Sequence, residues 1–255
     1  MANYNACKLF YFGPEEPDLQ ENADINLQWI PLVHISPIEN SGKEILDAIE
    51  KCDYIIFTSP RGVRITKELF YKQGLLSSIL NSLSEKSIIV IGGSTGKAVE
   101  NEFYIKPCCL PIEWDSWGLG DLLCEIHPRC SLLLRARQAS SILEEKLKDC
   151  NIHYRKVALY DVIPMNKVRG IVIPKGSPII LSSSLIARIF IEYYGCPNDS
   201  PLIALGRTTL KTINNMCSSV TVYIPSRPLL EEAIILARNI ACNAREKIKD
   251  KNKLL

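Results

Sequence analysis

The sequence lacks the features that would attach it to a membrane or to nucleic acid. Its richest apolar stretch, residues 179–194, is interrupted by serines, an arginine and a glutamate, so it is unsuited to span a bilayer. The first residues show no cationic start followed by an apolar segment, so we expect no export signal. Thirty basic against 28 acidic side chains leave a net charge of +2, too little for sequence-independent nucleic-acid binding. We therefore expect neither a membrane nor nucleic acid as a partner.

Motifs of nucleotide chemistry are also missing. The stretch 92–97, GGSTGK, ends like a P-loop, but Ile91 stands where the first glycine is needed. Ala98 follows the lysine in place of the Ser or Thr that would bind magnesium. No G-x-G-x-x-G motif occurs. A nucleotide-dependent transferase is therefore the weakest of the functions considered, and we expect no cofactor.

Cysteine is plentiful, with ten residues, yet the sequence contains no C-x-x-C pair. Without an export signal we expect a cytoplasmic protein whose cysteines are reduced and act as small buried apolar side chains. Cys124 and Cys130 flank His127, which leaves a metal site as the less favoured alternative. The three histidines have no obvious cysteine or aspartate partner, and no G-x-S-x-G motif occurs. We therefore expect neither a bound metal nor a nucleophilic triad.

The recurring pattern is a short apolar run, a small polar turn and an amphipathic helix. Three such runs occupy residues 55–57, 88–91 and 132–134. They are continuous rather than alternating, as strands buried on both faces of a parallel sheet are. Ser59 is placed to cap the following helix and Pro60 to begin it, while Ser141 and Glu144 have the spacing of a capping box. The alternation predicts an α/β fold with parallel sheets.

The pattern then repeats in the second half of the chain. Residues 179–183 match 55–59: three apolar positions, two hydroxyl residues, then a helix. Residues 204–209 match 90–95: two apolar residues, a glycine, two further residues and a threonine. Two matches in the same order indicate two similar α/β domains, although strand–hydroxyl–helix units also recur in α/β proteins without duplication.

Two extended stretches with prolines mark the predicted domain boundaries. Before the first, only two strands (8–12 and 26–30) and a weak helix are expected, too little for a domain. These strands are therefore expected to complete the C-terminal sheet. We predict two flavodoxin-like parallel-sheet domains joined by a two-stranded β connector. The predicted ranges are 1–33 plus 165–255 for a discontinuous domain, 38–156 for an inserted domain, and 31–37 and 157–164 for the connector strands.

Hydroxyl side chains stand where predicted strands end and helices begin. At such positions, free backbone N–H groups and the helix dipole bind carboxylates or phosphates without any Lys or Arg. The predicted turn residues are Thr58, Ser59 and Thr95 in the first copy, and Ser182, Ser183, Gly206 and Thr209 in the second. The alternative is that each hydroxyl only caps its helix. Four turns in matched positions favour anion-binding rims that face across a cleft.

An ordered series of short segments resembles the uroporphyrinogen-III synthase family. The segments are PLVHISP at 31–37, DYIIFTSPRGV at 53–63, IGGST at 91–95, LRA at 134–136, and Tyr160 four residues before Pro164. The resemblance extends over about residues 30–215, and the ordered set is more specific than any single segment. It implies two similar α/β domains joined by a β connector, in agreement with the boundaries above.

The resemblance also implies an activity, a lyase reaction of heme biosynthesis. The substrate would be hydroxymethylbilane, a linear tetrapyrrole, which is cyclised to uroporphyrinogen III with loss of water and inversion of ring D, without a cofactor. Tyr160 matches the tyrosine proposed to assist departure of the hydroxyl group, and Arg135 and the turn residues above match substrate-binding positions. The protein would act as a monomer.

Some positions depart from the family pattern. The first strand ends Phe12-Gly13-Pro14 where the family often has Thr-Arg-Pro, and Ala136 replaces the glycine after Arg135. Ser140 and Ser141 also fall where a second arginine is common in the family, and the missing arginines remove cationic contacts that the resemblance would otherwise imply. A second hypothesis is a non-catalytic two-domain binder of a small polyanionic ligand, which would use the same turns but would need no acid at Tyr160.

Overall fold

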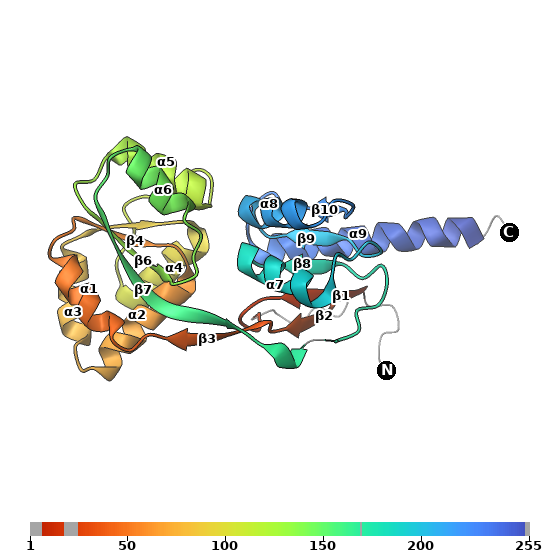
Figure 1. The fold of residues 1–255 in the computed structure, drawn as a ribbon, viewed down its shortest axis with the longest axis horizontal. Coiled ribbons are helices and arrows are strands. Elements are labelled where there is room, and N and C mark those ends of the chain that lie inside the picture. Colours follow the sequence, from red (N-terminus) through yellow and green to blue (C-terminus); the bar gives the residue numbers. More distant parts are fainter. Residues whose placement is uncertain (1–6, 18–24, 169, 253–255) are drawn as a thin grey trace. The chain divides into compact units, whose positions relative to one another are not determined.

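The computed structural model describes residues 7–17, 25–168 and 170–252, and its fold is α/β with two five-stranded sheets (Figure 1). The α/β class predicted from the sequence is therefore confirmed. Residue contacts divide the chain into two compact units. Unit 1 comprises Met1–His34 and Ile163–Leu255, and unit 2 comprises Ile35–Val162. The weak helix expected between the first two strands falls largely on residues 18–24, outside the described part of the chain.

Unit 1 contains a parallel sheet with the strand order β10-β9-β8-β1-β2. Its strands are β1 (Cys7–Phe12), β2 (Ile25–Ile30), β8 (Ile179–Leu181), β9 (Leu202–Ala204) and β10 (Val222–Tyr223). Its helices are the 3-10 helix η1 (Asn166–Val168), α7 (Ser184–Tyr194), α8 (Arg207–Met216) and α9 (Leu230–Asn252). The sheet joins distant parts of the chain, because β1 pairs with β8 along Phe10–Phe12 and Ile179–Leu181.

Unit 2 contains the second sheet, with the strand order β3-β7-β6-β4-β5. Its strands are β3 (Val33–Pro37), β4 (Tyr54–Phe57), β5 (Ser87–Val90), β6 (Ser131–Ala136) and β7 (Tyr154–Pro164). The first two residues of β3 and the last two of β7 fall within the bounds of unit 1. Its helices are α1 (Ser41–Ile49), α2 (Pro60–Lys72), α3 (Leu76–Ser84), α4 (Gly93–Phe103), α5 (Ser116–Ile126) and α6 (Ile142–Asp149). The pairs β4–β5, β4–β6 and β6–β7 are parallel.

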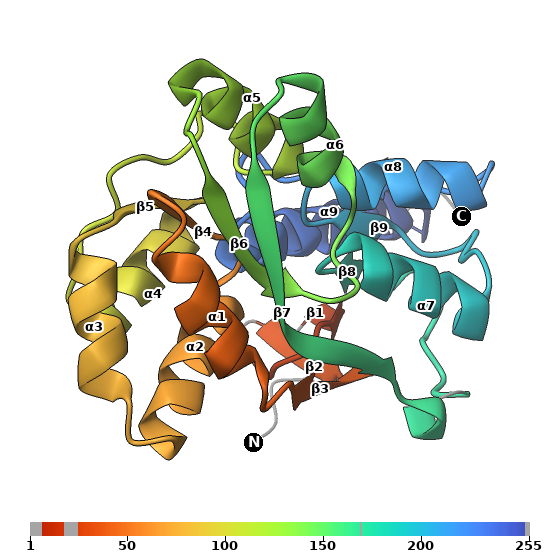
Figure 2. The same ribbon diagram turned by 60° about the vertical axis from the view of Figure 1, so that its left-hand side comes forward.

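Helices cover both faces of the unit 2 sheet (Figure 2). Ile55 and Phe57 of β4 belong to a buried cluster that includes residues of α1, α2, α3 and α4. Ile56, between them, belongs to a second cluster with residues of α5 and α6. Because successive side chains of a strand point to opposite faces, a continuous apolar run is required when both faces are covered. This is the physical reason why the unbroken run at 55–57 predicts its strand correctly.

The two predicted connector stretches contain β3 and the end of β7, which are neighbours in one sheet. The Ile38 amide donates to the Leu159 carbonyl, and the Met165 amide donates to the Leu32 carbonyl. Residue numbers rise along one stretch as they fall along the other, so the two run antiparallel.

The cysteines differ from the expectation. The pairs Cys52–Cys130, Cys124–Cys150 and Cys196–Cys217 lie with their sulfur atoms within bonding distance, as disulfides. The prediction of reduced cysteines is therefore wrong for these six residues. The partners are 21 to 78 residues apart in the chain, so no local spacing reveals them. Cys124 and Cys130 also bond to different partners, which rules out the joint metal site considered from their spacing.

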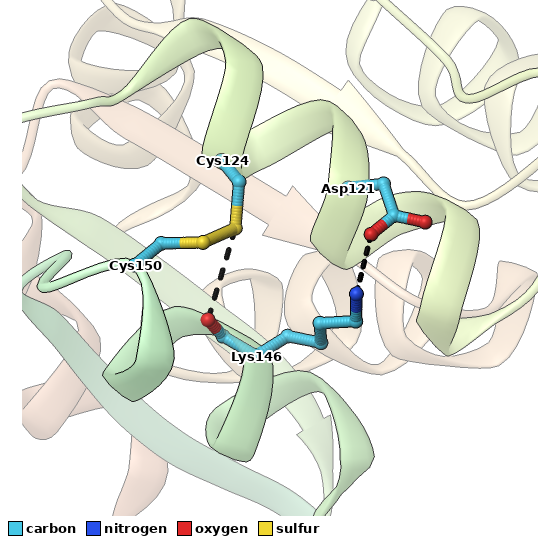
Figure 3. Close-up of a disulfide and its surroundings, with 4 residues drawn as sticks. All are labelled: Asp121, Cys124, Lys146 and Cys150. Carbon is cyan, nitrogen blue, oxygen red and sulfur yellow. Dashed lines mark hydrogen bonds and ion pairs between the residues drawn. A yellow bond between two sulfur atoms is a disulfide. The ribbon is translucent and has the colours of Figure 1, made fainter.

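The disulfide Cys124–Cys150 joins α5 to the end of α6 (Figure 3). Lys146 Nζ of α6 donates to Asp121 Oδ1 of α5 at 2.6 Å, and the Lys146 carbonyl oxygen lies 3.7 Å from Cys124 Sγ. A Cβ on Gly120 would lie only 2.8 Å from Lys146 Cβ, so this close approach requires a glycine. The two helices are thus held by packing, an ion pair and a covalent bond.

The predicted helix starts are correct in position at both Ser59 and Ser141, but the capping box predicted at Ser141 is wrong. Ser59 Oγ accepts a hydrogen bond from the Gly62 amide, and Pro60 is the first residue of α2. Ser141 precedes α6 without capping it, because its hydroxyl donates to Glu145 instead. The Glu144 carboxylate, which a capping box would use at the helix start, pairs with Arg135. Along the described residues, no helix is both long and apolar enough to cross a membrane.

Candidate functional site

The start of α2 in unit 2 brings a predicted acid and a predicted turn residue together. Ser59 is extended (φ −163°, ψ 151°), which aims its side chain back at the first turn of the helix. Its Oγ lies 3.1 Å from the Gly62 amide nitrogen and 3.3 Å from Tyr160 Oη. The tyrosine hydroxyl is therefore held at the positive end of a helix by a residue 101 positions away in the chain.

Tyr160 lies on β7 at a break in the regular strand pairing. The register between β6 and β7 shifts at Arg135 and Ala136, so that Ala136 pairs with Tyr160. Such a bulge turns a side chain out of the regular alternation, and bulges are frequent beside functional sites. Tyr160 is only 5% exposed, and the guanidinium carbon of Arg61 lies 5.8 Å from the centre of its ring. Arg61 therefore covers the tyrosine ring by a cation–π contact.

Arg135 lies behind this turn, at 3% exposure. Its Nη1 donates to Glu144 Oε2 at 2.7 Å, and Lys156 Nζ lies 2.9 Å from the other oxygen of the same carboxylate. Burial lowers the pKa of the Arg135 guanidinium, while the Glu144 carboxylate and Tyr160 act in the opposite direction. The structure therefore shows Arg135 as a buried partner of Glu144 and an electrostatic neighbour of Tyr160.

The second turn of unit 2, at the start of α4, is covered by an aromatic ring. Gly92 precedes the helix in an extended conformation without a side-chain cap, and Thr95 is buried inside the first helical turn. A Cβ on Gly93 would lie 2.9 Å from Cη2 of Trp114, and a Cβ on Gly92 would lie 3.0 Å from the indole. The paired glycines thus admit the indole of Trp114, which gives them a structural role unrelated to a P-loop.

Unit 1 has two turns of the same construction. Ser183 is extended and its Oγ accepts a hydrogen bond from the Ile186 amide at 3.3 Å, as Ser59 does from Gly62. Gly206 precedes α8 as Gly92 precedes α4, and Thr209 is buried at the position of Thr95. The matched pairs of turns predicted from the sequence thus recur in the geometry.

The two remaining predicted residues stand immediately before the serine caps. Thr58 and Ser182 are both half-buried. The Ser182 hydroxyl oxygen is buried and makes no hydrogen bond with the described residues. Of the predicted residues of unit 2, the structure brings Ser59, Tyr160 and Arg135 together, whereas Thr95 lies on the next helix.

Two neighbours of the site, Arg61 and Trp114, were not predicted from the sequence. The position of Arg61 in the first turn after the Ser59 cap is the signal that would have placed it near the turn. Trp114 lies in an irregular segment before α5, so only the tertiary fold brings it to the glycines.

Comparison with known proteins identifies the family. A family model described as "Uroporphyrinogen-III synthase HemD" matches residues 19–234. The uroporphyrinogen-III synthetase structure from Helicobacter pylori superposes with a TM-score of 0.61 at 15% identity, covering 91% of this chain and 99% of that one. A mutant uroporphyrinogen III synthase from Thermus thermophilus gives 0.61 at 14% identity, covering 94% and 100% of the two chains, and the wild-type protein gives 0.55 at 16%, covering 95% and 100%.

No curated protein sequence matches the chain. At identities of 14 to 16% the structural likeness shows the fold, while the family model extends over most of the sequence. The family resemblance derived from the ordered segments is confirmed. The chain belongs to the uroporphyrinogen-III synthase family, cyclising hydro-lyases of tetrapyrrole biosynthesis.

Proposed function

We propose that in this chain Tyr160 is the acid that starts cyclisation of hydroxymethylbilane to uroporphyrinogen III. The observation that carries the proposal is the contact of 3.3 Å between Tyr160 Oη and Ser59 Oγ at the start of α2. A proton donor must lie within hydrogen-bond reach of the leaving group. The negative charge that develops on the phenol oxygen is stabilised there by the helix start and by Arg135.

The first step breaks one bond and moves one proton. The electron pair of the pyrrole nitrogen next to the hydroxymethyl group expels the hydroxyl group, which takes the Tyr160 proton and leaves as water. An azafulvenium cation and the Tyr160 phenolate remain. The substituted carbon of ring D attacks this electrophile, and the spiro intermediate fragments and recloses at the free carbon of ring D. The proton lost from that carbon on reclosure restores the phenol. The substrate is already reactive, so the chain contributes mainly orientation and proton transfer.

We propose that the helix starts bind the carboxylates of the substrate. The proposed residues are Thr58, Ser59, Thr95, Ser182, Ser183, Gly206 and Thr209. The hydroxyls of Ser59 and Ser183 already cap their helices. The anion contacts are therefore assigned mainly to backbone N–H groups and to the hydroxyls of Thr58 and Ser182. Arg135, which is buried on Glu144, would act by positioning the end of β6 rather than by touching substrate.

The domain organisation within the family fold is part of the same proposal. Reading the unit 1 sheet from β2 gives the order 2-1-3-4-5 in the unit's own strand numbering, which is that of flavodoxin-like folds. This order supports a flavodoxin-like domain of residues 1–33 plus 165–255. In the unit 2 sheet, β5-β4-β6-β7 read 2-1-3-4 when counted from β4, which supports a second such domain of residues 38–156, with 31–37 and 157–164 as connector strands. We further propose a cytoplasmic monomer that binds no nucleic acid and needs no cofactor.

The family match favours this activity over the non-catalytic polyanion binder. The test is a Tyr160→Phe variant supplied with freshly prepared hydroxymethylbilane, with the uroporphyrin isomers resolved after oxidation. We expect kcat to fall by about 10²- to 10⁴-fold while KM changes little, because only a proton donor is removed. Tyr71→Phe, on an exposed residue of α2, is the matched control and should retain full activity.

Two results would contradict the proposal. If the wild-type protein yields only isomer I at the rate seen without protein, the activity is absent. If the wild type yields isomer III and Tyr160→Phe does so at an unchanged rate, the activity stands and Tyr160 is not its acid.

A further inference from the structure

A pocket of about 580 Å³ lies in unit 2 at the amino ends of strands β4, β6 and β7. It is lined by Lys51, Arg129, Cys130, His153, Tyr154 and Arg155. Three of these side chains are permanent cations and none is a carboxylate. In the chain as a whole, basic and acidic side chains are nearly balanced, so the excess of cations is a local feature of the pocket.

The position of the pocket separates it from the proposed active site. The strands β4, β6 and β7 are parallel neighbours in the sheet (Figure 2). Their first residues Tyr54, Ser131 and Tyr154 are paired in register. The lining residues immediately precede or begin these strands. Thr58 and Ser59 follow β4 at its opposite, carboxyl end. A strand of four residues is about 13 Å long, so this turn is about that far from the amino end of β4. A ligand in this pocket would therefore not touch the proposed catalytic turn.

The cations of the pocket are available to a ligand. Lys51, Arg129 and Arg155 are all exposed, and no carboxylate of the described residues forms an ion pair with them. Asp53, which lies between Lys51 and β4, does not line the pocket, and its Oδ1 accepts a hydrogen bond from the Cys130 amide at 2.9 Å. Unpaired guanidinium groups present planar pairs of N–H donors that match the oxygens of a phosphate.

The backbone that carries these side chains is fixed. The Cys130 carbonyl accepts the amides of Asp53 and Tyr54, and the Ser131 amide donates to the His153 carbonyl at 3.0 Å. The disulfide Cys52–Cys130 ties the segment before β4 to the segment before β6. Little conformational entropy of the backbone would be lost on binding, which favours recognition of a small ligand.

From this cluster we infer a second anion-binding site in unit 2, formed by Lys51, Arg129 and Arg155, for a small ligand that carries a phosphate or diphosphate group. Tyr154 and His153 complete the lining and offer further hydrogen-bonding groups. The site is independent of the proposed synthase activity, because it involves none of the residues assigned to that reaction.

The probe is inorganic pyrophosphate, titrated calorimetrically into the full-length protein at low ionic strength in a phosphate-free buffer. We expect saturable binding of one equivalent that weakens as salt is added. Arg129→Gln and Arg155→Gln should each weaken binding about tenfold, because each removes a charge-assisted contact. Arg129→Lys should weaken it less, since the charge remains. Arg188→Gln, on an exposed arginine of α7 in unit 1, is the matched control and should bind as the wild type does.

Three results would overturn the inference. The first is the absence of pyrophosphate binding, including the case in which an oligonucleotide or an anionic vesicle binds instead. The second is binding that all three glutamine variants weaken equally, as bulk charge would cause. The third is binding that Arg129→Gln and Arg155→Gln leave unchanged, which would place the anion at the helix starts. Turnover of hydroxymethylbilane by the same variants is measured separately and should be retained.

Discussion

The buried ion pair between Arg135 and Glu144 supports the sharpest prediction about stability. Replacing Arg135 with Met keeps an unbranched side chain of similar length but leaves the carboxylate of Glu144 buried beside it. Removal of one partner from a buried pair costs about 3–5 kcal/mol, because the remaining charge is uncompensated. Lys156 lies 2.9 Å from the same carboxylate with 31% of its side chain exposed, and this second cation should reduce the loss. We therefore expect a loss of about 3 kcal/mol, the lower end of that range.

The assay is equilibrium unfolding in urea, which gives the free energy of unfolding. Arg137→Met is the matched control: Arg137 pairs with Asp161 at 2.9 Å, but 59% of its side chain is exposed. An exposed pair contributes less than about 1 kcal/mol. The double variant Arg135→Met/Glu144→Leu should recover most of the stability, since no buried charge is then left. Equal losses for Arg135→Met and Arg137→Met, or a double variant less stable than Arg135→Met alone, would refute the reasoning.

Three further predictions concern sulfur and packing. Replacing Cys124 and Cys150 together with Ser should lower the free energy of unfolding by about 3.5 kcal/mol, the loop-closure value for a span of 26 residues; a loss below 1 kcal/mol would contradict this. Burial, with a smaller contribution from the neighbouring thiol of Cys109, raises the pKa of Cys108 to about 11. Its alkylation by iodoacetamide, followed by mass spectrometry, should therefore be slow at pH 8 and become faster as the pH is raised toward this pKa. Gly93→Ala should displace Trp114, because the new Cβ would lie 2.9 Å from the ring, and the tryptophan emission should then shift to the red. Gly74→Ala is the control: it has open space around it but a strained positive φ, and it should leave the emission unchanged.

Local patterns in the sequence predicted much of the fold. The run at 179–181 coincides with β8, and the serine caps of α2 and α7 are where the hydroxyl turns predicted them. These features depend on a few consecutive residues, so the sequence contains the information directly. The contact of Ser59 with Tyr160 was not predicted, because the two residues are 101 positions apart and no local pattern links them.

The wrong expectations share a physical cause. The spacing of Ser141 and Glu144 satisfies a capping box, yet the carboxylate gains more from two cations than from a single backbone amide. Likewise the expected redox state of the cysteines was inferred from the assumed compartment, whereas disulfides depend on which loops meet in space. In both cases the outcome depends on contacts between residues far apart in the chain, and such contacts cannot be read from local spacing.

The pairing of β1 with β8 has a consequence for the order in which the protein forms during synthesis. Unit 2 is one continuous segment and can fold as soon as it has left the ribosome. The strands β1 and β2 leave earlier, but β1 must wait for β8, roughly 165 residues later, or about 10–30 s at usual rates of translation. During that interval one edge of the β1–β2 pair has no neighbouring strand. The strands β1 and β2, which are made before unit 2, are therefore among the last to reach their final structure.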